Sequence, residues 1–146
     1  MDKIFLWVLV GLVLVYAFQP VPACVPIPED ELSTTPPETI YSGERIDRLN
    51  AELDSKGFIT IQTIGDSMLP TIKTNSACLC ERKKYYQGDI VLFFTDNNQG
   101  IAHRFFSEID GMIFTKGDNN NFTESTTKEK ILCSIPEVRR YELWKW

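Results

Sequence analysis

The sequence predicts a compact, mostly β domain that follows an apolar amino-terminal segment and a short helix. Three observations lead to this fold class. Apolar residues fill most of the first two dozen positions, a proline-rich stretch comes next, and beyond residue 57 short β-branched and aromatic runs alternate with turn residues. Short strands at this spacing, separated by Asn- and Gly-containing turns, are typical of a small β domain.

The apolar run begins at Ile4 and, continued to Ala23, reaches the roughly 20 residues that a bilayer requires. Lys3 precedes it and acidic residues follow it, which favours a cytoplasmic amino terminus and a domain on the outer face. We therefore expect residues 1–23 to form a single-pass transmembrane anchor. A cleaved secretory signal, or a lipoprotein signal ending before Cys24, also explains the run. Under all three interpretations the remainder is exported or held at the outer membrane face.

Residues 24–41 belong to a proline-rich stretch and predict an extended, semi-rigid spacer. Residues 42–57 place apolar side chains at helical spacing, include an i,i+4 acid–base pair, and end in Gly57. We expect a short amphipathic helix that lies on the domain or beside the membrane. A solvated surface helix accounts for the same pattern.

Residues 58–146 are expected to form the β domain, because the periodicity changes from helix to strand after Gly57. The pair Asp110-Gly111 between two apolar runs is a strong signal for a two-residue hairpin turn. The expected strands are 58–64, 77–81, 89–94, 101–106, 112–115, 132–135 and 138–144. The aromatic residues expected in the core, or at its rim facing substrate or membrane, are Phe93, Phe94, Phe105, Phe106, Phe114, Trp144 and Trp146.

The charge and cysteine content narrow the function classes. The net charge is −5 without a basic block, which argues against nucleic-acid binding. The four cysteines lack zinc-type spacing and the single histidine is remote from them, so we expect no metal. Cys78 and Cys80 lie on one face of an expected strand and are poorly placed to bridge each other. Two alternatives stay open: one of these two cysteines is bonded to Cys133, or the cysteines are buried free thiols. Cys24 is not assigned a partner.

Three residues could carry acyl-transfer chemistry. Ser67 lies just past a β-branched run, where its side chain can be exposed and its own N–H can stabilise an oxyanion. His103 is the single histidine, and Asp118 lies in a Gly-Asp-Asn-Asn turn. A serine, an imidazole and a carboxylate at three strand ends are what nucleophilic catalysis needs. Taken singly, each has a plainer explanation: a turn, a structural histidine and a surface loop.

Four motifs in order resemble the successive boxes of type I signal peptidases, over residues 58 to about 135. The motifs are Gly65-Asp66-Ser67-Met68-Leu69-Pro70-Thr71, Gly88-Asp89-Ile90-Val91, Ala102-His103-Arg104 and Thr115-Lys116-Gly117-Asp118-Asn119-Asn120. The histidine before Arg104 resembles the branch found in archaea and the endoplasmic reticulum, since the bacterial branch has lysine there.

The resemblance implies a membrane-anchored serine endopeptidase that removes signal peptides from preproteins, cutting after small residues at −1 and −3. It implies Ser67 as nucleophile, the Ser67 backbone N–H as an oxyanion donor and His103 as general base, without a cofactor. Its partners would be preprotein signal peptides and membrane lipid. Asp118 is the favoured third member. Glu124, six residues on where that branch usually has aspartate, is the alternative acid.

Two features set this chain apart from the pattern. Many relatives carry a serine where this chain has Gly65, and the lost hydroxyl removes an oxyanion donor worth about 2.7–4 kcal/mol, so slower or narrower activity is expected. An Asn121-Phe122-Thr123 sequon lies beside the expected acids.

Two further function classes stand beside the signal peptidase. One is a self-cleaving repressor-type peptidase with a serine–lysine pair, for which the candidate bases are Lys73, Lys83, Lys84 and Lys116. The histidine and the apolar amino terminus oppose it. The other is a catalytically weak, membrane-tethered module that binds peptides.

Overall fold

The computed structural model describes residues 22–35 and 37–136. Nearly all of the expected anchor and the last expected strand, 138–144, lie outside these residues, as do Trp144 and Trp146. Within the described part of the chain, no helix combines the length and the apolar character needed to cross a membrane.

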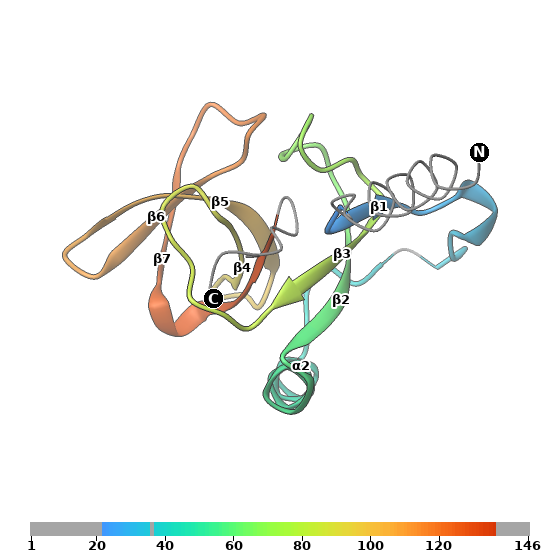
Figure 1. The fold of residues 1–146 in the computed structure, drawn as a ribbon, viewed down its shortest axis with the longest axis horizontal. Coiled ribbons are helices and arrows are strands. Elements are labelled where there is room, and N and C mark those ends of the chain that lie inside the picture. The colour runs from blue at the N-terminus through green and yellow to red at the C-terminus, as the bar shows by residue number, and fades with distance from the viewer. Residues whose placement is uncertain (1–21, 36, 137–146) are drawn as a thin grey trace, which may run out of the picture. The chain divides into compact units, whose positions relative to one another are not determined.

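The described residues form an antiparallel β unit, which confirms the mostly β fold class. Eight strands make one sheet in the order β1-β3-β8-β4-β5-β6-β7, and β2 pairs with β3. Figure 1 shows β1, β2 and β3 in one group and β4 to β7 in another. The strands are β1 (Cys24–Pro26), β2 (Phe58–Thr63), β3 (Ser76–Glu81), β4 (Ile90–Phe94), β5 (Gly100–Ile109), β6 (Met112–Lys116), β7 (Glu124–Thr127) and β8 (Ile131–Ile135).

Each strand expected among the described residues is present, with small differences at its ends. The hairpin between β5 and β6 turns at Asp110 and Gly111, whose φ angles of 50° and 80° suit the two-residue turn that the sequence predicts. β7 was not expected, because the sequence Glu-Ser-Thr-Thr has no apolar alternation. It lies at the edge of the sheet, where such alternation is not required.

The stretch expected to be a spacer is folded onto the sheet instead. β1 pairs with β3, and Ile40 forms a bridge with Gln99 in the loop between β4 and β5. Short 3₁₀ turns occupy Glu29–Glu31 and Lys128–Lys130. The compact unit begins at Ala23 and therefore includes residues that proline content alone assigns to a linker.

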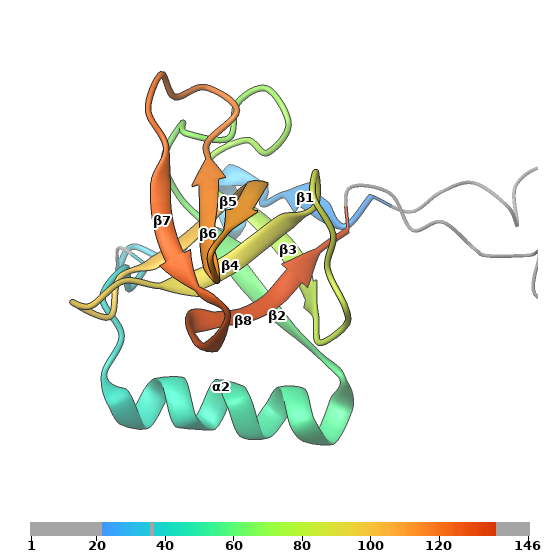
Figure 2. The ribbon, with the colours of Figure 1, turned by 90° about the vertical axis from the view of Figure 1, so that its left-hand side faces the viewer.

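The expected helix is present as α2 (Gly43–Lys56). Ser42 caps it by accepting a hydrogen bond from Arg45 N at 3.2 Å, and Gly57, with φ of 80°, ends it. Leu49 and Leu53 are buried in the apolar core, and α2 contacts β2. Figure 2 shows the helix lying along one side of the β unit. The helix therefore lies on the domain, and its proximity to a membrane stays a prediction.

The aromatic core is partly as expected. Phe93, Phe94 and Phe105 are buried, whereas Phe106 is 55% exposed and Phe114 is half-buried. The pairing of β5 with β6 shifts register between Phe105 and Ser107, so Phe106 is the extra residue of a bulge. A bulge removes its residue from the regular alternation of the strand, which explains why Phe106 faces solvent.

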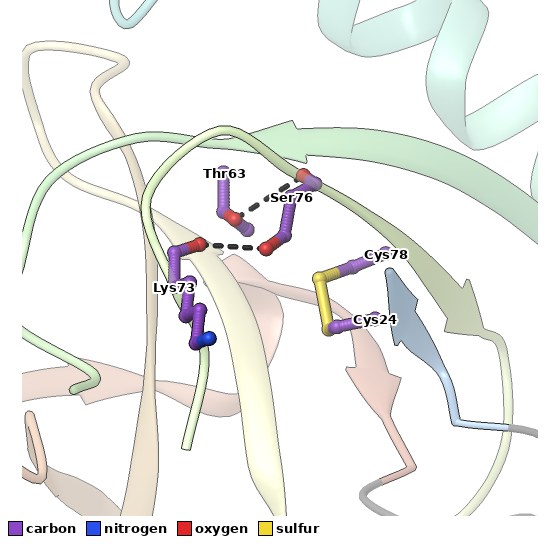
Figure 3. Close-up of a disulfide and its surroundings, with 5 residues drawn as sticks. All are labelled: Cys24, Thr63, Lys73, Ser76 and Cys78. Atoms are coloured by element: carbon purple, nitrogen blue, oxygen red, sulfur yellow. Dashed lines mark hydrogen bonds between the residues drawn. A yellow bond between two sulfur atoms is a disulfide. The ribbon is translucent and has the colours of Figure 1, made fainter. Parts of the chain in front are cut away.

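Two disulfides connect strands of the sheet. Cys80 is bonded to Cys133 across β3 and β8, which is one of the two alternatives that the sequence leaves open. Cys24 is bonded to Cys78 across β1 and β3 and is drawn in Figure 3. Cys78 and Cys80 are thus bonded to different partners, as their common face requires.

Candidate active site

The loop that carries Ser67 is closed at its base. It connects β2 to β3, and Asn75 N donates to Thr63 O at 2.8 Å across its two ends. Thr63 Oγ1 donates to Ser76 O at 3.2 Å, and Ser76 Oγ donates to Lys73 O at 2.7 Å (Figure 3). Because Ser76 is buried and hydrogen-bonded, the base of this Ser67 loop is fixed to the sheet.

A second loop, residues 117–123 between β6 and β7, packs against the Ser67 loop. Asn119 N donates to Ser67 O at 2.8 Å, and Asn119 Nδ2 donates to Asp66 O at 3.1 Å. Both loops project from the same end of the β unit in Figures 1 and 2. A Cβ atom on Gly117 would lie 2.6 Å from Ser67 O, so only glycine permits this approach.

His103 lies on β5 and joins Ser67 to an acid. The His103 side chain is 6% exposed, and its Nε2 is 3.0 Å from Ser67 Oγ. Its Nδ1 is 2.7 Å from Glu124 Oε2. A carboxylate only accepts hydrogen bonds, so Glu124 selects the tautomer with hydrogen on Nδ1 and leaves Nε2 to accept from the serine hydroxyl.

The structure brings Ser67 and His103 together as expected, but Asp118 does not contact the imidazole. Arg104 Nε and Nη2 donate to the two oxygens of Asp118 at 2.8 and 2.6 Å, and Thr71 Oγ1 donates to the same carboxylate. Successive strand residues point to opposite faces, so Arg104 and His103 face opposite sides of β5. Asp118 is bonded to Arg104 on the side of β5 that faces away from the imidazole. The favoured assignment of Asp118 as the acid beside His103 is therefore corrected: the carboxylate that contacts the imidazole is Glu124.

The ion pair of Asp118 and Arg104 ties three parts of the site together. Arg104 Nη1 also donates to Gly88 O at 2.8 Å, in the turn before β4, and Thr71 belongs to the Ser67 loop. The hydrogen bond from Arg104 lowers the pKa of Asp118, burial opposes this, and the bond from Thr71 lowers it further. Asp118 therefore holds the loops together on the side of β5 opposite the imidazole of His103.

A cleft of about 380 Å³ lies beside Ser67, His103 and Glu124. One wall is the end of β2 and the following residues, and another is the start of β5. No lysine lines the described cleft. The lining residues that are both apolar and buried, here called its floor, are Leu49, Met68, Ile72, Leu92 and Phe94. The apolar residues that line it are Tyr41, Leu49, Ile61, Ile64, Met68, Ile72, Leu92, Phe94, Ile101, Ala102 and Phe122.

Two strand edges in this cleft have no partner strand in the described part of the chain. β2 pairs only with β3, and residues 101–103 of β5 pair only with β4 because β6 joins β5 from Arg104 onward. Both edges line the cleft. An unpaired strand edge presents backbone N–H and C=O groups that an extended peptide can bind.

The Ser67 backbone N–H makes no hydrogen bond within the described residues and is free to donate to a ligand. Gly65, two residues earlier, has a φ of 90° and donates from its own N–H to Thr74 Oγ1 at 3.0 Å. The site therefore retains one expected oxyanion donor and holds a left-handed glycine where many members of the resembling family have serine.

Sequence reasoning missed the contribution of residues 38–41 to the cleft. Tyr41 N donates to Asn98 O at 2.9 Å, and the Tyr41 ring meets Phe94 edge to face with the centroids 5.3 Å apart. Burial raises the pKa of Tyr41, so its phenol stays neutral. The signal was present as the apolar pair Ile40-Tyr41, which interrupts an otherwise polar stretch directly before the helix.

Comparison with known proteins finds no match to any protein-family model, any curated protein or any solved structure. The signal-peptidase resemblance therefore depends on the four sequence motifs and stays a prediction.

Proposed function

We propose that this chain is a membrane-anchored serine endopeptidase of the type I signal peptidase kind, which removes amino-terminal signal peptides from exported proteins. One observation carries the proposal: Ser67, His103 and Glu124 form a continuous hydrogen-bonded array, with contacts of 3.0 and 2.7 Å, at the edge of a cleft with a partly apolar lining. The relay of hydroxyl, imidazole and carboxylate is the geometry of serine-hydrolase catalysis on unrelated folds.

In the proposed reaction, Ser67 Oγ attacks the scissile carbonyl carbon while His103 Nε2 accepts the serine proton. Glu124 keeps the imidazole oriented and stabilises its protonated form, and the Ser67 N–H donates to the oxyanion. The C–N bond then breaks, and His103 delivers its proton to the leaving amine. Water, deprotonated by the same imidazole, hydrolyses the acyl-enzyme and restores the serine.

The substrate we propose is an extended peptide lying between the two unpaired edges of the cleft. Main-chain hydrogen bonds to β2 and to residues 101–103 would hold the peptide beside Ser67. The apolar floor would receive side chains near the scissile bond. The preference for small residues at −1 and −3 comes from the family resemblance, and from nothing in the cleft itself.

The placement we propose is a single anchor in residues 1–23 with the β unit on the outer membrane face. The disulfides Cys24–Cys78 and Cys80–Cys133 support it, because disulfides persist in oxidising compartments and are rare in the cytosol. The same bonds, and the absence of lysine from the described cleft lining, disfavour a cytoplasmic serine–lysine repressor peptidase.

A catalytically weak peptide-binding module is the second candidate, and Gly65 is the observation that favours it. Without a hydroxyl at this position the oxyanion loses a donor, while the cleft and its open strand edges would still bind peptides. Both candidates predict that the cleft binds peptides, but efficient cleavage of the bound peptide is predicted only for the peptidase.

The deciding experiment uses the full chain in membranes and a model preprotein, comparing wild type with Ser67→Ala and Ser125→Ala. Ser125 is an exposed serine next to Glu124 and serves as the matched control. The peptidase predicts cleavage by wild type and Ser125→Ala and none by Ser67→Ala. Cleavage by all three would remove Ser67 as nucleophile. Binding without cleavage by any of them would establish the module.

A further inference from the structure

The loop beside the active site contains the single Asn-X-Ser/Thr sequence of the chain, Asn121-Phe122-Thr123. This sequence is the acceptor for N-linked glycans, and the motif alone is a weak signal because many copies are never modified. Its position in the structure decides whether the asparagine amide is available to react.

Three consecutive asparagines in this loop have different surroundings. Asn119 donates from its side-chain amide to Asp66 O. The side chain of Asn120 lies against Gly117, because its Nδ2 is 2.9 Å from the position that a Cβ atom on Gly117 would take. Asn121 is exposed and makes no hydrogen bond within the described part of the chain. Phe122 and Thr123 are exposed as well, and the three residues belong to no helix or strand. The whole acceptor sequence is therefore accessible.

Asn121 also lies at the rim of the cleft, outside its lining. Asn120 and Phe122 line the cleft, whereas Asn121 between them does not. A glycan attached there would stand beside the entrance and leave the cleft itself open. An extended peptide could still reach Ser67, while a folded domain approaching from this side would meet the glycan.

We propose that Asn121 is an N-glycosylation site at the rim of the cleft. In the reaction the Asn121 side-chain nitrogen forms a bond to C1 of a lipid-pyrophosphate-linked oligosaccharide. The bond from C1 to the phosphate oxygen breaks, the lipid pyrophosphate leaves, and the amide loses one proton. The modification rests on the outward placement proposed above, where such donors are used, and is independent of peptidase activity.

The test is synthesis of the full chain in the presence of microsomes that carry an oligosaccharyltransferase. Wild type is compared with Asn121→Gln, Thr123→Ala and Thr123→Ser, and the products are examined by gel mobility before and after endoglycosidase and by mass spectrometry of the loop peptide. Thr123→Ser is the matched control, since it changes the same residue and preserves the acceptor sequence. We expect one endoglycosidase-sensitive glycan in wild type and Thr123→Ser and none in the other two.

A wild-type chain without the glycan would overturn the proposal, and so would a glycan that persists in Thr123→Ala. Disulfide mapping and added protease on the same samples separate this failure from a failure of the proposed placement. A translocated, disulfide-bonded chain that lacks the glycan overturns the acceptor site alone. A reduced chain that is digested outside the vesicles overturns both.

Discussion

Glu124 Oε2 lies 2.7 Å from His103 Nδ1, at the beginning of the edge strand β7. Pairing of Thr115 on β6 with Glu124 on β7 places this carboxylate beside the imidazole. The longer glutamate side chain reaches from the edge of the sheet to a residue on β5, two strands away. The third member of the proposed triad is therefore fixed by strand register, which the sequence motifs do not reveal.

Exchanging the acid for its amide should affect the two candidate positions very differently. Glu124→Gln leaves a side chain of the same shape that can favour the wrong imidazole tautomer, so we expect kcat to fall by about 10³–10⁴. Asp118→Asn leaves the contact between His103 and Glu124 intact and should cost roughly tenfold or less, through looser loops. Steady-state kinetics on one preprotein would measure both.

Glu124→Asp is the control for this ranking. It keeps the charge but shortens the reach, so its kcat should lie between those of wild type and Glu124→Gln. The opposite ranking, with Asp118→Asn the slower enzyme and both proteins folded, would return Asp118 to the triad and make Glu124 structural.

The role we assign to Asp118 predicts a pH dependence of stability. The bond from Arg104 lowers the pKa of Asp118 in the folded state, so the carboxylate adds stability above the ordinary Asp pKa of about 4. That stability is lost as pH falls through the lowered folded-state pKa. The free energy of unfolding of Asp118→Asn should therefore be furthest below wild type near neutral pH and approach it at strongly acidic pH, as measured by urea unfolding.

Asp96→Asn is a suitable comparison, because Asp96 pairs with Lys130 while 89% of its side chain is exposed. Exposed pairs contribute little, so this variant should follow wild type across the same pH range. A constant difference between Asp118→Asn and wild type at every pH would show that the charge of Asp118 is not what stabilises the fold.

The strands β2 to β6 and β8, the helix and the hairpin turn at Asp110-Gly111 could be predicted because local pattern determines them. The Ser67 loop and His103 could also be predicted, since each carries its own motif. Glu124 and Asp118 could not be distinguished, because both are near His103 in sequence and the alternation of β5 decides which one faces it. β1 and residues 38–41 were missed because their partners lie far along the chain.

Gly117 is a further position where the close approach of two loops determines the residue. A methyl group there would lie 2.6 Å from Ser67 O and about 3 Å from the Asn120 side chain, so the two loops must separate in Gly117→Ala. We expect kcat/KM to fall by about tenfold to a hundredfold, since a displacement near 1 Å in an active site costs on this order. The measurement is kinetics on a short peptide, with unfolding monitored in parallel.

Gly43→Ala is the matched control for Gly117→Ala. A Cβ at position 43 meets nothing within 4 Å, and alanine is favoured over glycine in a helix. This variant should retain full activity with equal or slightly higher stability. Unchanged kinetics in Gly117→Ala would show that the loops can move apart without displacing Ser67.

The last prediction concerns the missing oxyanion hydroxyl at Gly65. Its φ of 90° lies where side chains are rarely found, although a Cβ there meets nothing within 4 Å. Gly65→Ser would therefore be strained by its backbone alone, at about 1–2 kcal/mol, and would not simply gain a donor. We expect Gly65→Ser and Gly65→Ala to unfold at similarly lowered denaturant concentrations, because both carry the same strain. The ratio of their kcat values measures the effect of the serine hydroxyl alone, and we expect this ratio to differ from one by no more than a fewfold while the left-handed backbone is kept.

The account would be refuted by a Gly65→Ser enzyme with unchanged stability that is faster than wild type by the roughly hundredfold or more that one oxyanion donor supplies. In that case the backbone at position 65 would accept serine without strain, and the loop conformation would not explain why this position is a glycine.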